Sequence, residues 1–152
     1  MRLLNIPVIL EDLEVANMPV NSCLQFNGYE VSKLYYEPVK TDISEFNLSP
    51  EFKKSTTEID EKNYIVELSV SFAPSDGAPL PFIVDVAIRG HFFVESEDKA
   101  LKDALISDNT VAIMFPYLRM LVSSLTNMGN ITPVLLPVIN LSQMFNDKEA
   151  GR

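Results

Sequence analysis

The side chains best suited to catalysis are few and isolated in this sequence. His91 is the only histidine and Cys23 the only cysteine in 152 residues. His91 lies in an alternating segment near Asp85 and Arg89, which favours a strand histidine over a general base. Cys23 has no basic neighbour in the sequence, which favours a structural thiol. Because no glycine-rich phosphate loop and no Cys/His cluster with metal-ligand spacing occurs, we expect no enzyme activity, no cofactor and no metal site.

Charge narrows the classes of partner. The chain has 12 Lys+Arg against 21 Asp+Glu, a formal net charge of −9. Nucleic acids and anionic membranes select clustered basic residues, so neither is an expected partner. The acidic stretches within 11–14 and 95–98 are interpreted as solvated faces. We find no signal-peptide pattern and no apolar run long enough to span a membrane, so the expectation is a cytoplasmic protein without membrane insertion.

The periodicity of the apolar residues predicts the strands of this chain, including the one that carries His91. Period-two alternation is clearest over 64–72 and 82–94 and predicts an antiparallel hairpin across a turn-rich connection at 73–81. Gly28 is expected to form a bulge in the first strand. The predicted strands are Leu24–Glu37, Phe52–Ile59, Tyr64–Phe72 and Phe82–Val94, with 38–50 as a loop.

From about residue 108 onward, the apolar residues recur with the period of a helix instead of that of a strand. Asp108 or Asn109 is expected to cap a helix that ends at Met128, and Gly129 to adopt the left-handed C-terminal conformation. Pro116 should kink this helix because it lacks a backbone donor.

The predicted helix carries apolar side chains on most of its sides. The sheet can cover one side, and a second subunit or a partner must cover the other. Arg119 is the only charged residue from Asn109 to Asn146. It is expected to pair with an acid from the sheet or from another subunit.

A short last helix is predicted after a linker that contains Pro133 and Pro137. Asn140 and Gln143 suit a cap and its capping-box partner, and Leu141, Met144 and Phe145 would form the apolar stripe. The domain expectation is an N-terminal extension at 1–20, one domain at 21–146 and a short tail at 147–152.

The helix and the segment after it resemble the SecB family of protein-export chaperones. The similarity covers roughly residues 24–146 and is most specific over 113–145, beginning with the run IMFPYLR at 113–119. The strands over 64–70 and 82–92 resemble the family's last two strands. The residues at matching positions are Phe115, Pro116, Tyr117, Arg119, Gly129, Pro137, Val138, Asn140 and Phe145.

This resemblance implies an α+β fold, with a four-stranded antiparallel sheet, a long helix packed on one side and a short C-terminal helix. It also implies a homotetramer, a dimer of dimers whose helices pack between sheets. The implied function is that of an ATP-independent holdase that binds unfolded polypeptide clients in hydrophobic grooves.

The resemblance also suggests site residues. Glu37, Ile83 and Asp85 match a patch that docks on the translocase ATPase SecA, although Lys33 stands where an acid is expected. Phe115, Tyr117, Arg119 and Leu121 are the residues expected at the oligomer helix. Residues expected to line the client groove, with core packing as the alternative for each, are Tyr36, Phe46, Phe52, Leu141, Met144 and Phe145.

Three alternatives remain open at this stage. The segment 147–152 does not resemble the translocase-binding tail, so a dedicated client such as an antitoxin is an alternative to SecA. A hot-dog thioesterase would need a carboxylate or histidine on or near its helix, and residues 109–128 contain none. A purely structural oligomer subunit is the third alternative.

Overall fold

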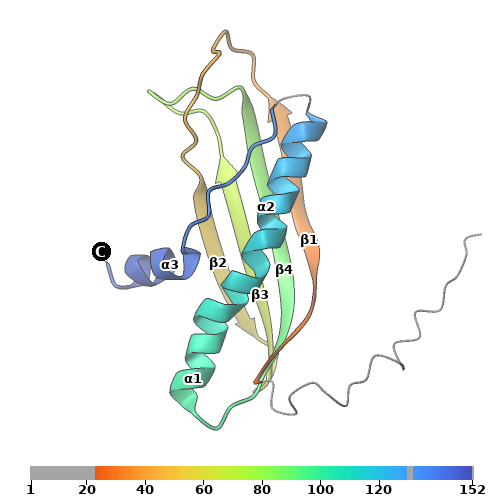
Figure 1. The fold of residues 1–152 in the computed structure, drawn as a ribbon, viewed down its shortest axis with the longest axis vertical. Helices are drawn as coiled ribbons and strands as arrows, with labels where there is room; N and C mark the ends of the chain where they lie inside the picture. The colour runs from red at the N-terminus through yellow and green to blue at the C-terminus, as the bar shows by residue number, and fades with distance from the viewer. Residues whose placement is uncertain (1–22, 130–131, 152) are drawn as a thin grey trace, which may run out of the picture.

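The computed structural model describes residues 23–129 and 132–151, which form a sheet with one long helix across its inner face (Figure 1). The four strands are antiparallel and lie in the order β1-β4-β3-β2. A short C-terminal helix lies beside the β2 edge (Figure 1). Within the described residues, no helix combines the length and apolarity needed to cross a membrane. The predicted α+β fold is confirmed, whereas the extension at 1–20 lies outside the described residues.

The four predicted strands are present almost as expected. They are β1 (Leu24–Pro38), β2 (Glu51–Glu58), β3 (Asn63–Phe72) and β4 (Phe82–Val94). In β3 and β4 the even-numbered residues are buried and most odd-numbered ones are not, because alternate side chains point to opposite faces. The hairpin prediction is confirmed, since Tyr64 lies opposite Phe92 and Phe72 opposite Val84.

The bulge predicted at Gly28 is also confirmed. Gly28 has a φ of 95°, and the pairing with β4 slips between Phe26 and Tyr29. A second slip, between Val31 and Lys33, was not predicted. Residues 31–33 contain no glycine or proline, so no local pattern indicates this second slip.

The start of the helical region differs from the prediction. Helix α1 (Lys99–Ala104) leads through a π-helical turn, η3 (Leu105–Asn109), into α2 (Thr110–Met128). Asn109 has helical backbone angles and its side chain makes no capping bond, so the expected cap at Asp108 or Asn109 is wrong. The side chain of Asp98 instead accepts a hydrogen bond from the Leu101 amide at 3.2 Å. Asp98 and the predicted Asp108 or Asn109 are all suitable cap residues, so tertiary contacts decide where the helical region begins.

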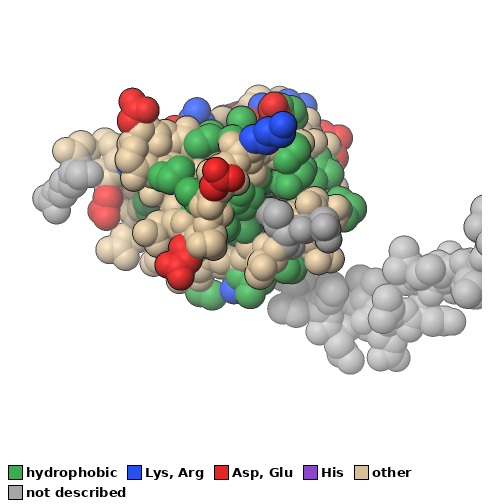
Figure 2. Space-filling model, turned by 90° about the horizontal axis from the view of Figure 1, so that it is seen from above, with side chains coloured by type: hydrophobic (Ala, Val, Ile, Leu, Met, Phe, Trp, Pro, Cys, Tyr) green, Lys and Arg blue, Asp and Glu red, His purple; other side chains and the backbone are tan. Residues whose placement is uncertain are grey.

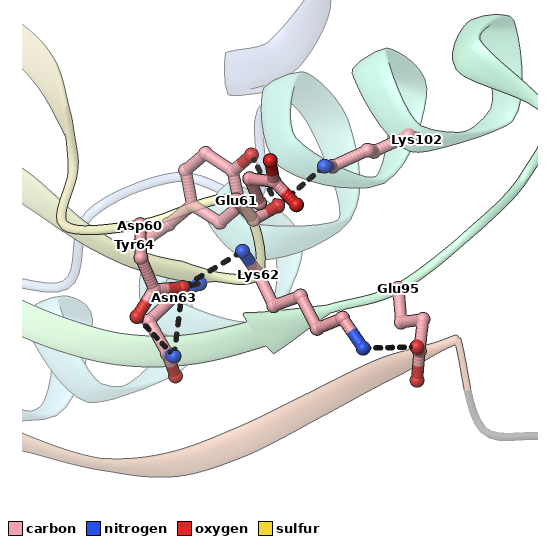
Figure 3. A network of polar contacts seen from close by, with 7 residues as sticks. All are labelled: Asp60, Glu61, Lys62, Asn63, Tyr64, Glu95 and Lys102. Atoms are coloured by element: carbon pink, nitrogen blue, oxygen red, sulfur yellow. Dashed lines mark hydrogen bonds and ion pairs between the residues drawn. The ribbon is translucent and has the colours of Figure 1, made fainter.

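Helix α1 is held against the β2–β3 turn by a polar network (Figure 3). Lys102 donates to the Glu61 carbonyl and lies over the Tyr64 ring. Amide hydrogen bonds from Lys62 and Asn63 hold the pKa of Asp60 below its usual value and close the turn. Helix α1 is therefore held on the sheet by contacts of its own, independently of α2.

The C-terminal end of α2 also differs from expectation. Gly129 has φ −72° and ψ 6°, so the expected left-handed cap is wrong. A Cβ atom added there would lie 2.5 Å from Cζ of Tyr36, so glycine is required for space rather than for backbone conformation. The Tyr36 hydroxyl donates to the Gly129 carbonyl at 3.4 Å. Pro116 lies inside α2, and the helix continues on both sides of it.

The core lies between the inner face of the sheet and α2. Val86 and Ile88 of β4 and Leu118 of α2 are fully buried. Thr126, also fully buried, accepts a hydrogen bond from the Val134 amide at 2.8 Å and ties the linker to the helix. Helix α3 (Leu141–Glu149) follows, and the side chain of Asn140 accepts a hydrogen bond from the Gln143 amide as predicted.

Candidate functional site

A groove of about 430 Å³ lies between β2 and α3. Phe52 of β2 and Phe145 of α3 supply its apolar surface, and Phe52 also packs edge-to-face on Phe115 at 6.1 Å. Phe52 is 3% exposed, so it offers a ligand only its rim, whereas Phe145 is half-buried. The other side chains that line the groove are Glu51, Lys53, Lys54, Thr56, Lys148 and Glu149.

The π-helical turn η3 positions both walls of this groove. Lys54 of β2 donates to the carbonyls of Ile106 at 3.3 Å and Ser107 at 2.7 Å. Ser142 of α3 donates to the Asp108 carbonyl at 3.1 Å. These side-chain donors tie the carbonyls of the π-helical turn to β2 and α3, and the Thr110 hydroxyl of α2 also donates to the Ile106 carbonyl at 2.7 Å. The turn is the point at which β2, α3 and the long helix meet.

The environment of Lys54 is electrostatically unusual. Burial lowers the pKa of Lys54 below the usual lysine value, and the nearby carboxylates of Glu149 and Asp108 act in the opposite direction. Nζ of Lys54 donates to two carbonyl acceptors, and an apolar side chain of similar length would leave both without this donor. No sequence pattern around Lys54 predicts that its side chain binds the carbonyls of η3.

The six side chains expected to line a client groove fall into two groups. Tyr36 and Phe46 both pack on Phe82, with ring centroids 6.4 Å and 5.4 Å from it. This group lies toward the C-terminal ends of β1 and α2, away from the groove at α3. The second group surrounds the groove or the base of α3 and consists of Phe52, Leu141, Met144 and Phe145.

The expected docking residues lie together on the outer face of the sheet. Glu37 lies opposite Ile83 in the β1–β4 pairing, and Asp85 is two residues further along β4. The carboxylates are occupied within the chain, because Lys33 forms an ion pair with Asp85 and the Tyr35 hydroxyl donates to Glu37.

The same face carries two further pairs. Arg89 binds Glu67 at 2.6 Å, and His91 lies 3.9 Å from Glu30. Two carboxylates of this face, Asp85 and Glu67, are therefore paired with a lysine and an arginine of the same chain, and His91 is a strand histidine beside a third, Glu30.

The side of α2 that faces away from the sheet is apolar and exposed. Met120 is 49% exposed and Met128 70%, and the linker adds Leu135 at 67% and Val138 at 81%. A second groove, of about 510 Å³, runs between this side of α2 and the linker. Hydrophobic side chains also reach the surface at the end of the molecule nearest the C-terminal end of α2 (Figure 2).

The residues expected at the oligomer helix divide between core and surface. Phe115 is 9% exposed, and Leu121 is half-buried against the core. Tyr117 is 36% exposed and packs on Tyr29 with ring centroids 4.6 Å apart.

Arg119 lines the groove between α2 and the linker, and its buried Nε has no hydrogen-bond partner within the part of the chain that the structure describes. The expected pairing with an acid of the sheet is therefore not found among those residues. A partner from another subunit stays a prediction.

Comparison with known proteins agrees with this architecture. The family described as "Preprotein translocase subunit SecB" matches residues 29–152. An uncharacterized protein of Methanocaldococcus jannaschii, MJ0357, is 30% identical, with 86% of this chain and 88% of that protein covered. The protein-export protein SecB of Xanthomonas oryzae pv. oryzae is 23% identical, with 93% and 89% covered.

A solved structure has the same fold. It is described as the Mycobacterium tuberculosis Rv1957 SecB-like chaperone in complex with a ChAD peptide from the Rv1956 HigA1 antitoxin. The TM-score is 0.63 at 15% identity, with 76% of this chain and 90% of that chain covered. Because the family match spans most of the chain and the strand order and helix placement agree with it, this protein belongs to the SecB family.

Proposed function

We propose that this protein is an ATP-independent holdase chaperone that binds unfolded polypeptides. Membership of the SecB family supports a chaperone role. The observation that carries the proposal is the open groove between β2 and α3, where Phe145 offers apolar surface beside exposed strand residues. Apolar burial is non-directional, so such a surface accepts many sequences. A dedicated client of the antitoxin type is the narrower form of the same function, since the similar Mycobacterium tuberculosis chaperone carries an antitoxin peptide.

Suppression of aggregation tests this proposal directly. At molar excess and without nucleotide, the protein should keep several unrelated unfolded proteins from scattering light. The effect should persist at moderate salt, because apolar burial is not screened as exposed charge pairs are. Phe145→Ser should weaken suppression, whereas Ile59→Ser, at a 58% exposed residue outside the groove, should not. Unchanged aggregation of every unfolded protein with the unmodified chain would refute the holdase function.

Assembly into a homotetramer, a dimer of dimers, is part of the proposal. Helix α2 packs one side on the sheet and exposes Met120 and Met128 on its outward side. A second copy covering this side would remove apolar surface from water and could supply an acceptor for Nε of Arg119.

Docking on the translocase ATPase SecA is proposed for the patch of Glu37, Ile83 and Asp85. Lys33 neutralises Asp85 by direct pairing. Lys33→Asp should therefore strengthen binding to a basic partner surface about fivefold, and Asp85→Lys should weaken it. Calorimetry against the cognate SecA measures both, with Lys99→Asp on α1 as the control of equal charge change. If neither the unmodified chain nor the Lys33 variant binds, the patch is not a docking site, and a dedicated client is favoured.

A further inference from the structure

The sequence before β1 contains an aliphatic run followed by acids. Six of the eight residues 3–10 are Leu, Ile or Val, and Glu11 and Asp12 come directly after them. No lysine or arginine occurs from residue 3 to residue 32. Residues 3–12, called the N-terminal segment below, lie outside the described residues and before the family match, which begins at residue 29. A surface that removes such an aliphatic run from water stabilises it.

The start of β1 and the end of β2 lie at the same end of the sheet (Figure 1). Leu24, the first residue of β1, lies opposite Val94 of β4. Tyr64 of β3 lies opposite both Phe92 of β4 and Glu58, the last residue of β2. Two strands, β4 and β3, separate β1 from β2. Three strand spacings correspond to a distance of about 14 Å.

The residues between the N-terminal segment and β1 are long enough to reach the groove between β2 and α3. The groove lies along residues 51–56 of β2, and Lys54 is about 13 Å along the strand from Glu58. The straight path from Leu24 to the middle of the groove is therefore about 20 Å. Residues 13–22 span up to about 33 Å when extended. The N-terminal segment can thus reach the groove of its own subunit.

The charges of the groove complement those of the N-terminal segment. Lys53, Lys54 and Lys148 line the groove together with two glutamates, in a chain of net charge −9. Lys54 donates to the η3 carbonyls, and Lys53 pairs with Glu51 at 3.6 Å. Lys148 forms no ion pair with any described residue. A carboxylate at the end of the N-terminal segment would be attracted to this ammonium group.

The apolar part of the groove suits the aliphatic part of the same segment. Phe145 is half-buried, and the rim of Phe52 lies beside it. Aliphatic side chains placed on these rings would leave water without any directional requirement. The N-terminal segment therefore combines the two properties that the groove selects, and it is attached to the same chain.

We propose that the N-terminal segment binds the groove between β2 and α3 of its own subunit and competes there with clients. This rests on the proposed holdase function and adds its regulation. A short tether gives an effective concentration of about 1 mM. A segment with a dissociation constant of about 0.1 mM would then fill about nine grooves in ten and lower client affinity about tenfold. Only polypeptides that bind more strongly displace it.

Client affinity of full-chain variants tests this competition. The probe is fluorescent lysozyme that is reduced and carboxymethylated, so it stays unfolded. Ile6→Ser/Ile9→Ser should raise the affinity about tenfold, because the segment loses apolar contacts and leaves the groove open. Val15→Ser/Val20→Ser is the matched control, since it removes two aliphatic side chains outside the segment and should leave the affinity unchanged. Equal affinity of the Ile6/Ile9 variant and the unmodified chain would overturn the proposal.

A cross-link tests the position of the segment without any client. A photoreactive benzoylphenylalanine in place of Ile9 should attach to residues 51–56 or 141–149, and excess probe should lower the yield. In a mixture of unlabelled and isotope-labelled chains, the two joined peptides should carry the same label, because segment and groove belong to one subunit. Cross-links outside the groove, or between differently labelled chains, would overturn the proposal.

Charge reversal tests the acidic end of the segment. Glu11→Lys/Asp12→Lys should lower the cross-link yield at least about threefold, and Lys148→Glu in the same chain should restore it, whereas Lys99→Glu on α1 should not. No restoration by Lys148→Glu would overturn the assigned orientation.

Failure of the competition is distinguishable from failure of the holdase function. Probe binding without a cross-link in the groove would overturn the competition alone. Absence of probe binding in every variant would refute the holdase function itself.

Discussion

Replacing Met120 with Asp is expected to dissociate the proposed tetramer while each subunit stays folded. Met120 is 49% exposed on the outward side of α2, so within one subunit the new carboxylate remains in water. In an apolar interface the same carboxylate would be desolvated and unpaired, which weakens association by about 3 kcal/mol or on the order of 100-fold in dissociation constant. Light scattering and sedimentation at micromolar concentration measure the mass, and circular dichroism reports the fold.

The choice of Met120 over Leu121 follows from burial. Leu121 is half-buried against the core of its own subunit, so a charge there would disturb folding as well as association. Ile59→Asp is the matched control, because Ile59 is 58% exposed and lies next to β2, away from α2. A monomeric mass for the unmodified protein, or an unchanged mass for Met120→Asp, would contradict assembly through this side of the helix.

Replacing Gly90 with Ala is expected to destabilise the subunit by about 3 kcal/mol, through overpacking of the helix against the sheet. A Cβ atom at this position would lie 2.7 Å from Cε2 of Phe92 and 2.8 Å from Sδ of Met114. Phe92 and Met114 are at most 1% exposed, so neither can turn into solvent to make room. Urea unfolding at fixed protein concentration measures the change.

A second substitution checks the physical reason. Met114→Ala removes the thioether that the new methyl group meets, so the loss in Gly90→Ala/Met114→Ala should be smaller than the sum of the two single losses. Arg89→Ala is the neighbouring control on the opposite face of β4, where only an exposed pair with Glu67 is lost. That change should cost less than about 1 kcal/mol. Additive losses in the double variant would contradict the close approach at Gly90.

The strands were predictable because their pattern is local. In β3 and β4 every second residue is apolar, apart from Gly90, and this alternation is enough to predict the two strands and the hairpin that they form. The bulge at Gly28 was predictable for a related reason, since glycine readily adopts the positive φ found there. The cap at Asn140 depends only on the three residues that follow it.

The beginning of the helical region was not predictable in this way. The residues Ser107, Asp108 and Asn109 are good cap residues, but they form a π-helical turn that Lys54 and Ser142 stabilise from distant parts of the chain. Asp98, the actual cap, has no stronger local pattern than Asp108. The choice depends on hydrogen bonds that span 34 to 53 positions in sequence.

The arrangement of the candidate site residues was not predictable from the sequence. Aromatic residues at 36, 46, 52 and 145 were expected to line one groove, with core packing as the alternative, and two of them pack on Phe82 at the other end of the sheet. The outer-face carboxylates were expected to be available, and the structure pairs them within the chain. Side-chain pairing across strands depends on register, and the slips near Gly28 and after Val31 set that register.

By itself, the sequence determined the alternation of the strands, the apolar side chains on most sides of the long helix and the IMFPYLR segment that resembles the SecB family. These are properties of residue type and near-neighbour spacing, which do not depend on the rest of the fold. Only the tertiary structure decided that β2 lies at an edge, that α3 stands beside it and that Gly129 makes room for Tyr36. The reason is that an edge, a groove and a close approach are each made by segments far apart in sequence, whose meeting is set by packing of the whole chain.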